Sequence, residues 1–141
     1  MTLFCFTHSS LSGIQKGIQS LHAAVDLVQK YTGPRAQLVN TWARDHKTVV
    51  VLDGGSCVDL QAIVYLLALS HPYPWTSFSE DASLSNALTA VAILLPPWMA
   101  ERPRPGSEFY EDLWRQWRAI HNPTDFDLKI VDLLNRSRKA V

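Results

Sequence analysis

The chain has 141 residues, of which 47% are hydrophobic and 18% charged, and its 13 basic side chains balance its 13 acidic ones. This length suits one domain with a real core, and this composition excludes a disordered chain. The zero net charge excludes a protein drawn to nucleic acid or an anionic membrane by its overall charge, although it leaves room for a local basic patch.

Several features predict a cytoplasmic protein that makes no membrane contact. Cys5 and Cys57 lie in apolar segments and are too few for a disulfide-built secreted domain, so we expect two buried, inert thiols. The start of the chain lacks the basic flank of a signal peptide. The longest apolar run, Leu88 to Met99, is well short of a membrane span of roughly 20 residues.

The chain opens with a strand and an amphipathic helix. Residues 3–6 are a short apolar run suited to a buried strand. Ser10 or Ser12 then caps a helix that ends near residues 31–33. Aliphatic residues recur along it at the spacings of one helix face. They are Ile14, Ile18, Leu21, Val25 and Val28.

A second helix and a second strand follow. Pro34 suits the first position of a helix, because its missing N–H has no partner to lose there, and Leu38 and Trp42 would anchor that helix. Residues 48–52 are β-branched and apolar on both faces, which is typical of an interior strand. Asp53 and the glycines at 54 and 55 then turn the chain.

A third helix and two more strands complete the predicted sheet. Ser56 and Asp59 form a capping-box pair at the start of the helix. Residues 75–78 and 88–95 read as strands joined by a polar loop. The resulting order predicts an α/β fold, a three-layer domain in which a four-stranded mixed sheet is flanked by helices, followed by a C-terminal helical tail.

Charge and proline mark the predicted segment boundaries. Residues 1–97 hold five basic and six acidic side chains, whereas residues 98–141 hold eight and seven. A run rich in Pro and Arg breaks helix and strand alike. We therefore predict an α/β domain over 1–97, a linker over 98–106 and an amphipathic helical tail over 107–141.

The tail contains two predicted helices. The first has an apolar stripe of Phe109, Leu113, Trp117 and Ile120, widened by Tyr110 and Trp114. Thr124 and Asp127 can cap the second. We expect both apolar faces to pack back on the body of the chain; docking on a second copy or on a protein partner is the alternative.

The first helix also carries the candidate catalytic residues. Gln15, Gln19, His22 and Asp26 follow one another at spacings of four, three and four, beside the apolar stripe. An imidazole with a carboxylate one turn away is a reasonable general base with its orienting partner. The alternative is a surface histidine that makes an ordinary helix-face contact.

Further along the chain, Glu80 and Asp81 follow the third strand and Thr89 opens the fourth. The two carboxylates contribute to a site only if the fold brings them near His22, and are otherwise solvated. Thr89 could lend a hydroxyl, or could simply reflect the preference of threonine for strands.

No phosphate, metal or cofactor site is predicted. Residues 53–56 join a strand to a helix but lack the lysine and spacing of a phosphate-binding loop, so a capped turn explains them better. The other histidines show no metal-ligand spacing with each other or with the cysteines.

Residues 14–25 resemble the first helix of type 2 peptidyl-tRNA hydrolases, a family with a Gln three residues before a His-Ala-Ala-Val run. Gln19 and His22 fall in that register. Residues 78–81 and 88–96 are similar to the family's acidic loop and its threonine-bearing last strand. The shortened form of this domain in phage-encoded proteins is closer still.

This resemblance covers residues 1–97 and implies hydrolysis of the ester that joins a peptide to the ribose of tRNA, with tRNA or another RNA as partner. It implies catalytic roles for His22 and Thr89 and for one of Glu80 and Asp81. The predicted substrate-binding residues are Gln15, Lys16, Gln19 and Asp26.

The chain departs from the family at its lysines. The family places two lysines nine and seven residues before the histidine, where this chain has Gly13 and Gln15. Lys16 is one position out of register, which turns it about 100° around the helix. Arg35 and Arg44 are the other cations that could replace them.

These departures leave a second function open. The chain would then be a catalytically inactive binding protein on the same fold, a phage accessory factor for example, with RNA, protein or a second copy of the chain as its partner. Trp114 and Trp117 in the tail are of a residue type enriched at interfaces.

Overall fold

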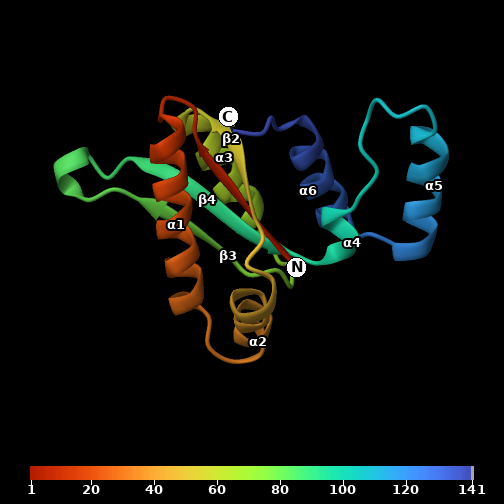
Figure 1. The fold of residues 1–141 in the computed structure, drawn as a ribbon, viewed down its shortest axis with the longest axis horizontal. Coiled ribbons are helices and arrows are strands. Elements are labelled where there is room, and N and C mark those ends of the chain that lie inside the picture. Colours follow the sequence, from red (N-terminus) through yellow and green to blue (C-terminus); the bar gives the residue numbers. More distant parts are fainter. Residues whose placement is uncertain (141) are drawn as a thin grey trace.

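A four-stranded sheet in the order β2-β1-β4-β3 forms the centre of the computed structural model, which describes residues 1–140 (Figure 1). β1 runs parallel to β2 and antiparallel to β4, and β3 and β4 form an antiparallel pair. The predicted α/β class and mixed sheet are confirmed. The strands are β1 (Thr2–His8), β2 (Val49–Gly55), β3 (Trp75–Ser79) and β4 (Leu88–Leu95).

Helices cover both faces of this sheet. α1 and α2 lie on one face, α3 and α6 on the other, and α5 lies outside α4 and α6 (Figure 1). The helices are α1 (Gly13–Lys30), α2 (Pro34–Thr41), the π-turn η1 (Trp42–His46), α3 (Cys57–Leu67), the 3₁₀ turn η2 (Ala82–Leu84), α4 (Pro97–Ala100), α5 (Tyr110–His121) and α6 (Asp125–Arg136). Complete capping boxes begin α1, α3 and α6.

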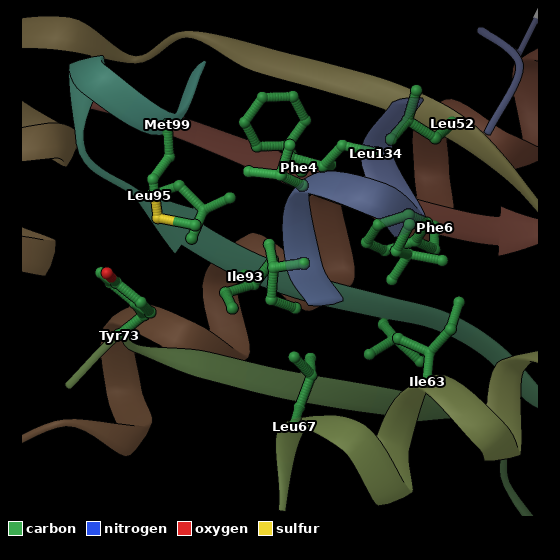
Figure 2. Close-up of a cluster of buried hydrophobic side chains, with 14 of the residues drawn as sticks. Phe4, Phe6, Leu52, Ile63, Leu67, Tyr73, Ile93, Leu95, Met99 and Leu134 are labelled. Carbon is green, nitrogen blue, oxygen red and sulfur yellow. The ribbon is translucent and has the colours of Figure 1, made fainter. Parts of the chain in front are cut away.

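The larger of two hydrophobic clusters lies between the sheet and the helices α3 and α6. Figure 2 shows Phe4 and Phe6 of β1 in one cluster with Leu67 of α3 and Leu134 of α6. Because side chains alternate across a strand, the even-numbered residues of β1 point to this face. Its fully buried members include Phe6, Leu60, Leu67, Ile93, Leu95, Met99 and Ile130.

α6 packs on the body as expected, whereas the predicted apolar stripe of α5 is buried only at Trp117, and its Phe109, Leu113 and Ile120 are exposed. α6 buries Ile130, Val131 and Leu134 in the larger cluster. α5 is anchored by Trp117, whose indole N–H donates to the carbonyl of Trp98 at 2.8 Å. The boundary predicted at residue 97 therefore separates β4 from helices that complete the same core.

The smaller cluster lies under α1 and α2. Leu3 and Cys5 of β1 meet Leu27 of α1 there, together with Val39 and Trp42. The prediction that Leu38 anchors α2 is wrong, because Leu38 is exposed and Val39 is fully buried. The indole of Trp42 donates to the carbonyl of Thr48 at 2.9 Å, and residue 39, three positions before residue 42, lies on the same side of the helix.

α1 turns its aliphatic stripe toward solvent. All five of its members are exposed, from 80% for Ile14 to 41% for Val28. The residues that α1 buries are instead Lys16, Gln19, Ser20, Ala23 and Leu27. The sheet beneath presents the small side chains of Ala90 and Ala92, so the polar side of the helix can approach closely.

β2 lies at the edge of the sheet, so the expectation of an interior strand is wrong. Its outer edge is partly covered by the end of the described chain. The N–H of Asp53 donates to the carbonyl of Arg138 at 2.9 Å, and the N–H of Ala140 donates to that of Val51 at 3.0 Å. These bonds pair part of the strand on its outer side as well, so β2 does not present a fully open edge.

The two cysteines differ in environment. Cys5 is fully buried, and burial raises the pKa of its thiol to about 12, so it remains protonated and inert as predicted. Cys57, at the start of α3, is exposed, and the expectation that it is buried is wrong. The apolar segment that suggested burial faces the core through Leu60 and Ile63 instead.

Candidate functional site

Gln19 is the centre of a polar network between α1 and the hairpin of β3 and β4. Its side-chain nitrogen Nε2 donates to Glu80 Oε1 at 2.6 Å. Its oxygen Oε1 accepts from the hydroxyl of Thr89 at 3.2 Å. Gln19 is 8% exposed and Thr89 is 6% exposed. The structure thus brings together residues 61 and 70 positions apart in sequence, all of which the sequence had marked as candidates.

His22 joins this network from the solvent side. Its Nδ1 lies 3.3 Å from Oε1 of Gln19. Its ring packs against that of Phe78 with 4.6 Å between centroids. The sequence had marked Phe78 only as part of a strand, and this contact gives it a role in holding the imidazole.

The network determines which nitrogen of His22 carries the proton. A carboxylate only accepts hydrogen bonds, so Glu80 requires the NH₂ group of Gln19, and the amide oxygen is left facing Thr89 and His22. An oxygen acceptor requires His22 Nδ1 to be the donor. In the neutral ring the lone pair is therefore on Nε2, which is the form of a general base.

Two predicted residues serve as caps and lie outside the network. Gln15 closes the capping box of α1, since its Oε1 accepts from the N–H of Ser12 at 2.9 Å. Asp81 caps η2 by accepting from the N–H of Ser83 at 2.9 Å. Hydrogen bonds from the Ser83 hydroxyl and backbone lower the pKa of Asp81, so it is ionised but directed into its own turn. Glu80 is the carboxylate that meets Gln19.

Asp26 does not orient His22 in the structure. It lies one turn further along α1, half-buried, and no hydrogen bond or ion pair within residues 1–140 joins it to the imidazole. The His–Asp interpretation of the helix spacing is replaced by a His–Gln contact at spacing three.

Lys16 is the cation on the buried side of α1. It lies one turn before Gln19 and is 8% exposed, and no ion pair to it is found in the described part of the chain. The other two replacement cations are engaged elsewhere. Arg35 donates to the carbonyl of His71 at 2.7 Å, and exposed Arg44 pairs with Asp45.

The network is open to solvent at His22, whose side chain is exposed. Neither His22 nor Glu80 lines the cavity described below. A substrate would therefore lie across an open surface, beside the aliphatic stripe of α1. Within residues 1–140 no three His, Cys, Asp or Glu side chains are grouped as metal ligands. The imidazole of His22 is the group in this network that is suited to acid–base chemistry.

Comparison of the sequence with protein-family models and with curated proteins gives no match. Over the described residues, none of the helices has both the length and the apolar character needed to cross a bilayer.

Proposed function

We propose that the chain is an esterase of the peptidyl-tRNA hydrolase type, with His22 as its general base. The observation that carries the proposal is the hydrogen-bond network in which Gln19 links Glu80, Thr89 and His22. These are the residues on which the resemblance to type 2 peptidyl-tRNA hydrolases rests, and the network leaves Nε2 of the neutral imidazole free to accept a proton.

In the proposed reaction, His22 activates a water molecule. Nε2 takes a proton as the water oxygen attacks the carbonyl carbon of the ester. When the tetrahedral intermediate collapses, the bond from that carbon to the ribose oxygen breaks, and the leaving oxygen takes the proton from His22. The products are a free peptide carboxyl group and a tRNA with a free hydroxyl.

The other residues of the network have positioning roles in this proposal. Glu80 fixes the amide of Gln19, and Gln19 fixes the tautomer of His22. Thr89 donates to Gln19, so its hydroxyl orients the amide rather than the substrate. Lys16, without a carboxylate partner among residues 1–140, would attract a phosphate or the developing oxyanion.

Release of peptide from a labelled peptidyl-tRNA at low salt tests the proposal. We expect His22→Ala to slow the reaction by about a hundredfold or more, the range for loss of a general base. His46→Ala is the matched control, because His46 is an exposed histidine outside the network. Equal rates for wild type and His22→Ala would exclude the mechanism, and no hydrolysis by a folded wild type would exclude the function.

The outward-facing stripe of α1 favours a second function, that of a binding protein that self-associates. The five aliphatic residues recur at spacings of four and three along 18 residues, which is the repeat of a coiled-coil seam. This repeat has two alternating apolar positions. The β-branched Ile18 and Val25 occupy one of them, and Leu21, which lies between these two residues, occupies the other.

A second copy of the chain is the partner that best fits this stripe. The residues beside it are uncharged, so two copies could approach without like-charge repulsion. Five such side chains present on the order of 400 Å² of apolar surface, about half of the ~800 Å² that each partner buries in a standard interface. The flanking residues are Gln15, Gly17, His22, Ala24 and Gln29.

This second function relocates the predicted interface. From the sequence, Trp114 and Trp117 of the tail were the residues suggested for it, but Trp117 is buried on Trp98. Sedimentation of the full chain over a range of concentrations distinguishes a monomer from a self-associating protein.

A further inference from the structure

A cavity of about 740 Å³ lies over β1 and β2 on the side of the sheet opposite α1. Its walls come from the sheet, from α4 and the Pro/Arg segment after it, and from the end of α6. The apolar part of the lining includes Met1, Phe4, Val50, Leu52, Pro97 and Leu134. Its volume falls within the range of about 300–1,000 Å³ typical of small-molecule sites.

Arg102 is a buried cation in the wall of this cavity. It is 7% exposed, and its guanidinium carbon lies 5.8 Å from the centre of the Phe4 ring. Nε donates to Asn135 Oδ1 at 2.8 Å, and Nη1 donates to the carbonyl of Ala100 at 3.1 Å. Both contacts hold the guanidinium in place, and neither partner carries a charge.

The charge of Arg102 is therefore not neutralised by the part of the chain described here. No carboxylate within residues 1–140 forms an ion pair with it. Two of the five N–H groups of a guanidinium are used in the contacts above, so others remain for a ligand. Burial, with a smaller contribution from the charge of Arg104, lowers the pKa of Arg102 to about 10. An anion in the cavity would relieve this penalty.

Two further cations border the same cavity. Arg104 and Lys139 line it with exposed side chains, and Glu101 is its single carboxylate among the described residues. The charged side chains of the lining, three cations and one carboxylate, sum to +2 in a chain whose overall charge is zero. A phosphate monoester carries about −1.5 to −2 at pH 7.

We propose that this cavity binds a small phosphate monoester with an apolar or aromatic body, such as a nucleoside monophosphate. The phosphate lies against the guanidinium of Arg102 and is reached by Arg104 and Lys139, and the body packs on the apolar wall. A planar guanidinium suits this role because it can donate two parallel hydrogen bonds to one phosphate. The site is separate from the His22 network, because the sheet lies between them.

Titration calorimetry and thermal melting of the full chain test the proposal, with AMP, adenosine and inorganic phosphate as probes. We expect AMP to bind and to raise the melting temperature. We expect adenosine and inorganic phosphate each to bind at least about tenfold more weakly, since each lacks one half of the recognised chemistry. Failure of AMP to bind at millimolar concentration would overturn the proposal, as would equal binding of AMP and adenosine.

Substitutions in the wall of the cavity test whether AMP binds there. Arg102→Gln should weaken AMP binding by about tenfold or more, because hydrogen bonds between charged groups are the stronger kind. Where that variant fails to fold, the double variant Arg104→Gln, Lys139→Gln changes only exposed side chains and should weaken binding as well. Arg118→Gln, an exposed arginine on α5 outside the cavity, should bind AMP like wild type. Unchanged affinity in the folded cavity variants would place the ligand elsewhere.

Discussion

His71 is a buried histidine held in its neutral form by its neighbours. Its Nε2 donates to the carbonyl of Leu67 at 2.8 Å, so Nδ1 must be the acceptor for the N–H of Tyr73 at 3.1 Å. The ring is stacked on Phe126 with 4.1 Å between centroids. Protonation of Nδ1 would place two N–H groups against each other. Burial lowers the pKa of His71, and the nearby charge of Arg35 lowers it further.

This environment predicts a loss of stability in mild acid. The unfolded chain takes up a proton at His71 near its ordinary pKa of 6.5, whereas the folded chain does so only at lower pH. The free energy of unfolding should therefore fall as the pH falls below about 6.5, with a slope of at most about 1.4 kcal/mol per pH unit, and level off below the folded pKa.

Urea denaturation between pH 7.5 and 5.5 measures this slope. His71→Gln should lose the part of the slope that belongs to this group, while His46→Gln, at an exposed histidine, should retain it. The same slope in wild type and His71→Gln would show that His71 does not couple stability to pH. The nearby Asp127 favours protonation of His71, so it limits the size of the effect.

At the residue scale, sequence reasoning found the members of the candidate site but not their connections. Helix spacing placed Gln19 and His22 on one face of the helix, and the ends of the predicted strands, together with the resemblance, marked Glu80 and Thr89. The role predicted for Asp26 rested on helix spacing alone. Spacing cannot show that His22 contacts the amide of Gln19 instead, which Glu80 holds in place from another element. The cavity at Arg102 gave no sequence signal, because its walls come from distant segments.

At the scale of elements, the positions of helices and strands were predicted well and their orientation less well. Capping residues and spacing located α1, α3 and α6, since these signals are local. The orientation of α1 depends on what the sheet presents to it. Two alanines of β4 and the hydroxyl of Thr89 favour the polar side of the helix, and an amphipathic pattern alone does not reveal this.

The exposed stripe of α1 predicts self-association that one charge should abolish. Leu21 lies at the middle of the stripe and is 61% exposed. Leu21→Glu should shift the full chain to monomer in sedimentation experiments, because two copies would bring like charges together in an apolar seam. Since the side chain already faces solvent, the free energy of unfolding should change by less than about 1 kcal/mol.

Val58→Glu provides the control for this prediction. Val58 is a similarly exposed aliphatic residue on α3, away from the stripe. It should leave the oligomeric state unchanged. A monomeric wild type, or association that both variants weaken equally, would remove the case for a seam on α1.

On the scale of the whole molecule, the larger core joins the two ends of the chain. Phe4 and Phe6 of β1 pack in one cluster with Ile130 and Leu134 of α6 (Figure 2). The composition change at residue 97 had suggested a body followed by a separate tail, but composition does not show which surfaces meet. The amphipathic pattern of α6 did predict that this helix is buried.

Removal of the tail should therefore unfold the body. A 1–97 truncation would expose the side of the sheet that α6 covers, and we expect it to aggregate and to show no cooperative unfolding transition. In the full chain, Ile130→Ala should lower the free energy of unfolding by about 2–5 kcal/mol, as is typical of a fully buried aliphatic side chain. Ile120→Ala, at a residue of α5 that is mostly exposed, should change it little. A soluble, cooperatively folding 1–97 truncation would show that the body is independent of the tail.

The position of α6 also bears on how the protein is made. β1 is synthesised before the other strands of the sheet and occupies its middle, yet one neighbouring strand begins at residue 49 and the other at residue 88. The helix that shields its aromatic side chains is synthesised later still. During translation the nascent chain must keep Phe4 and Phe6 from non-native contacts until more than a hundred further residues have emerged, a situation in which chaperones commonly protect growing chains.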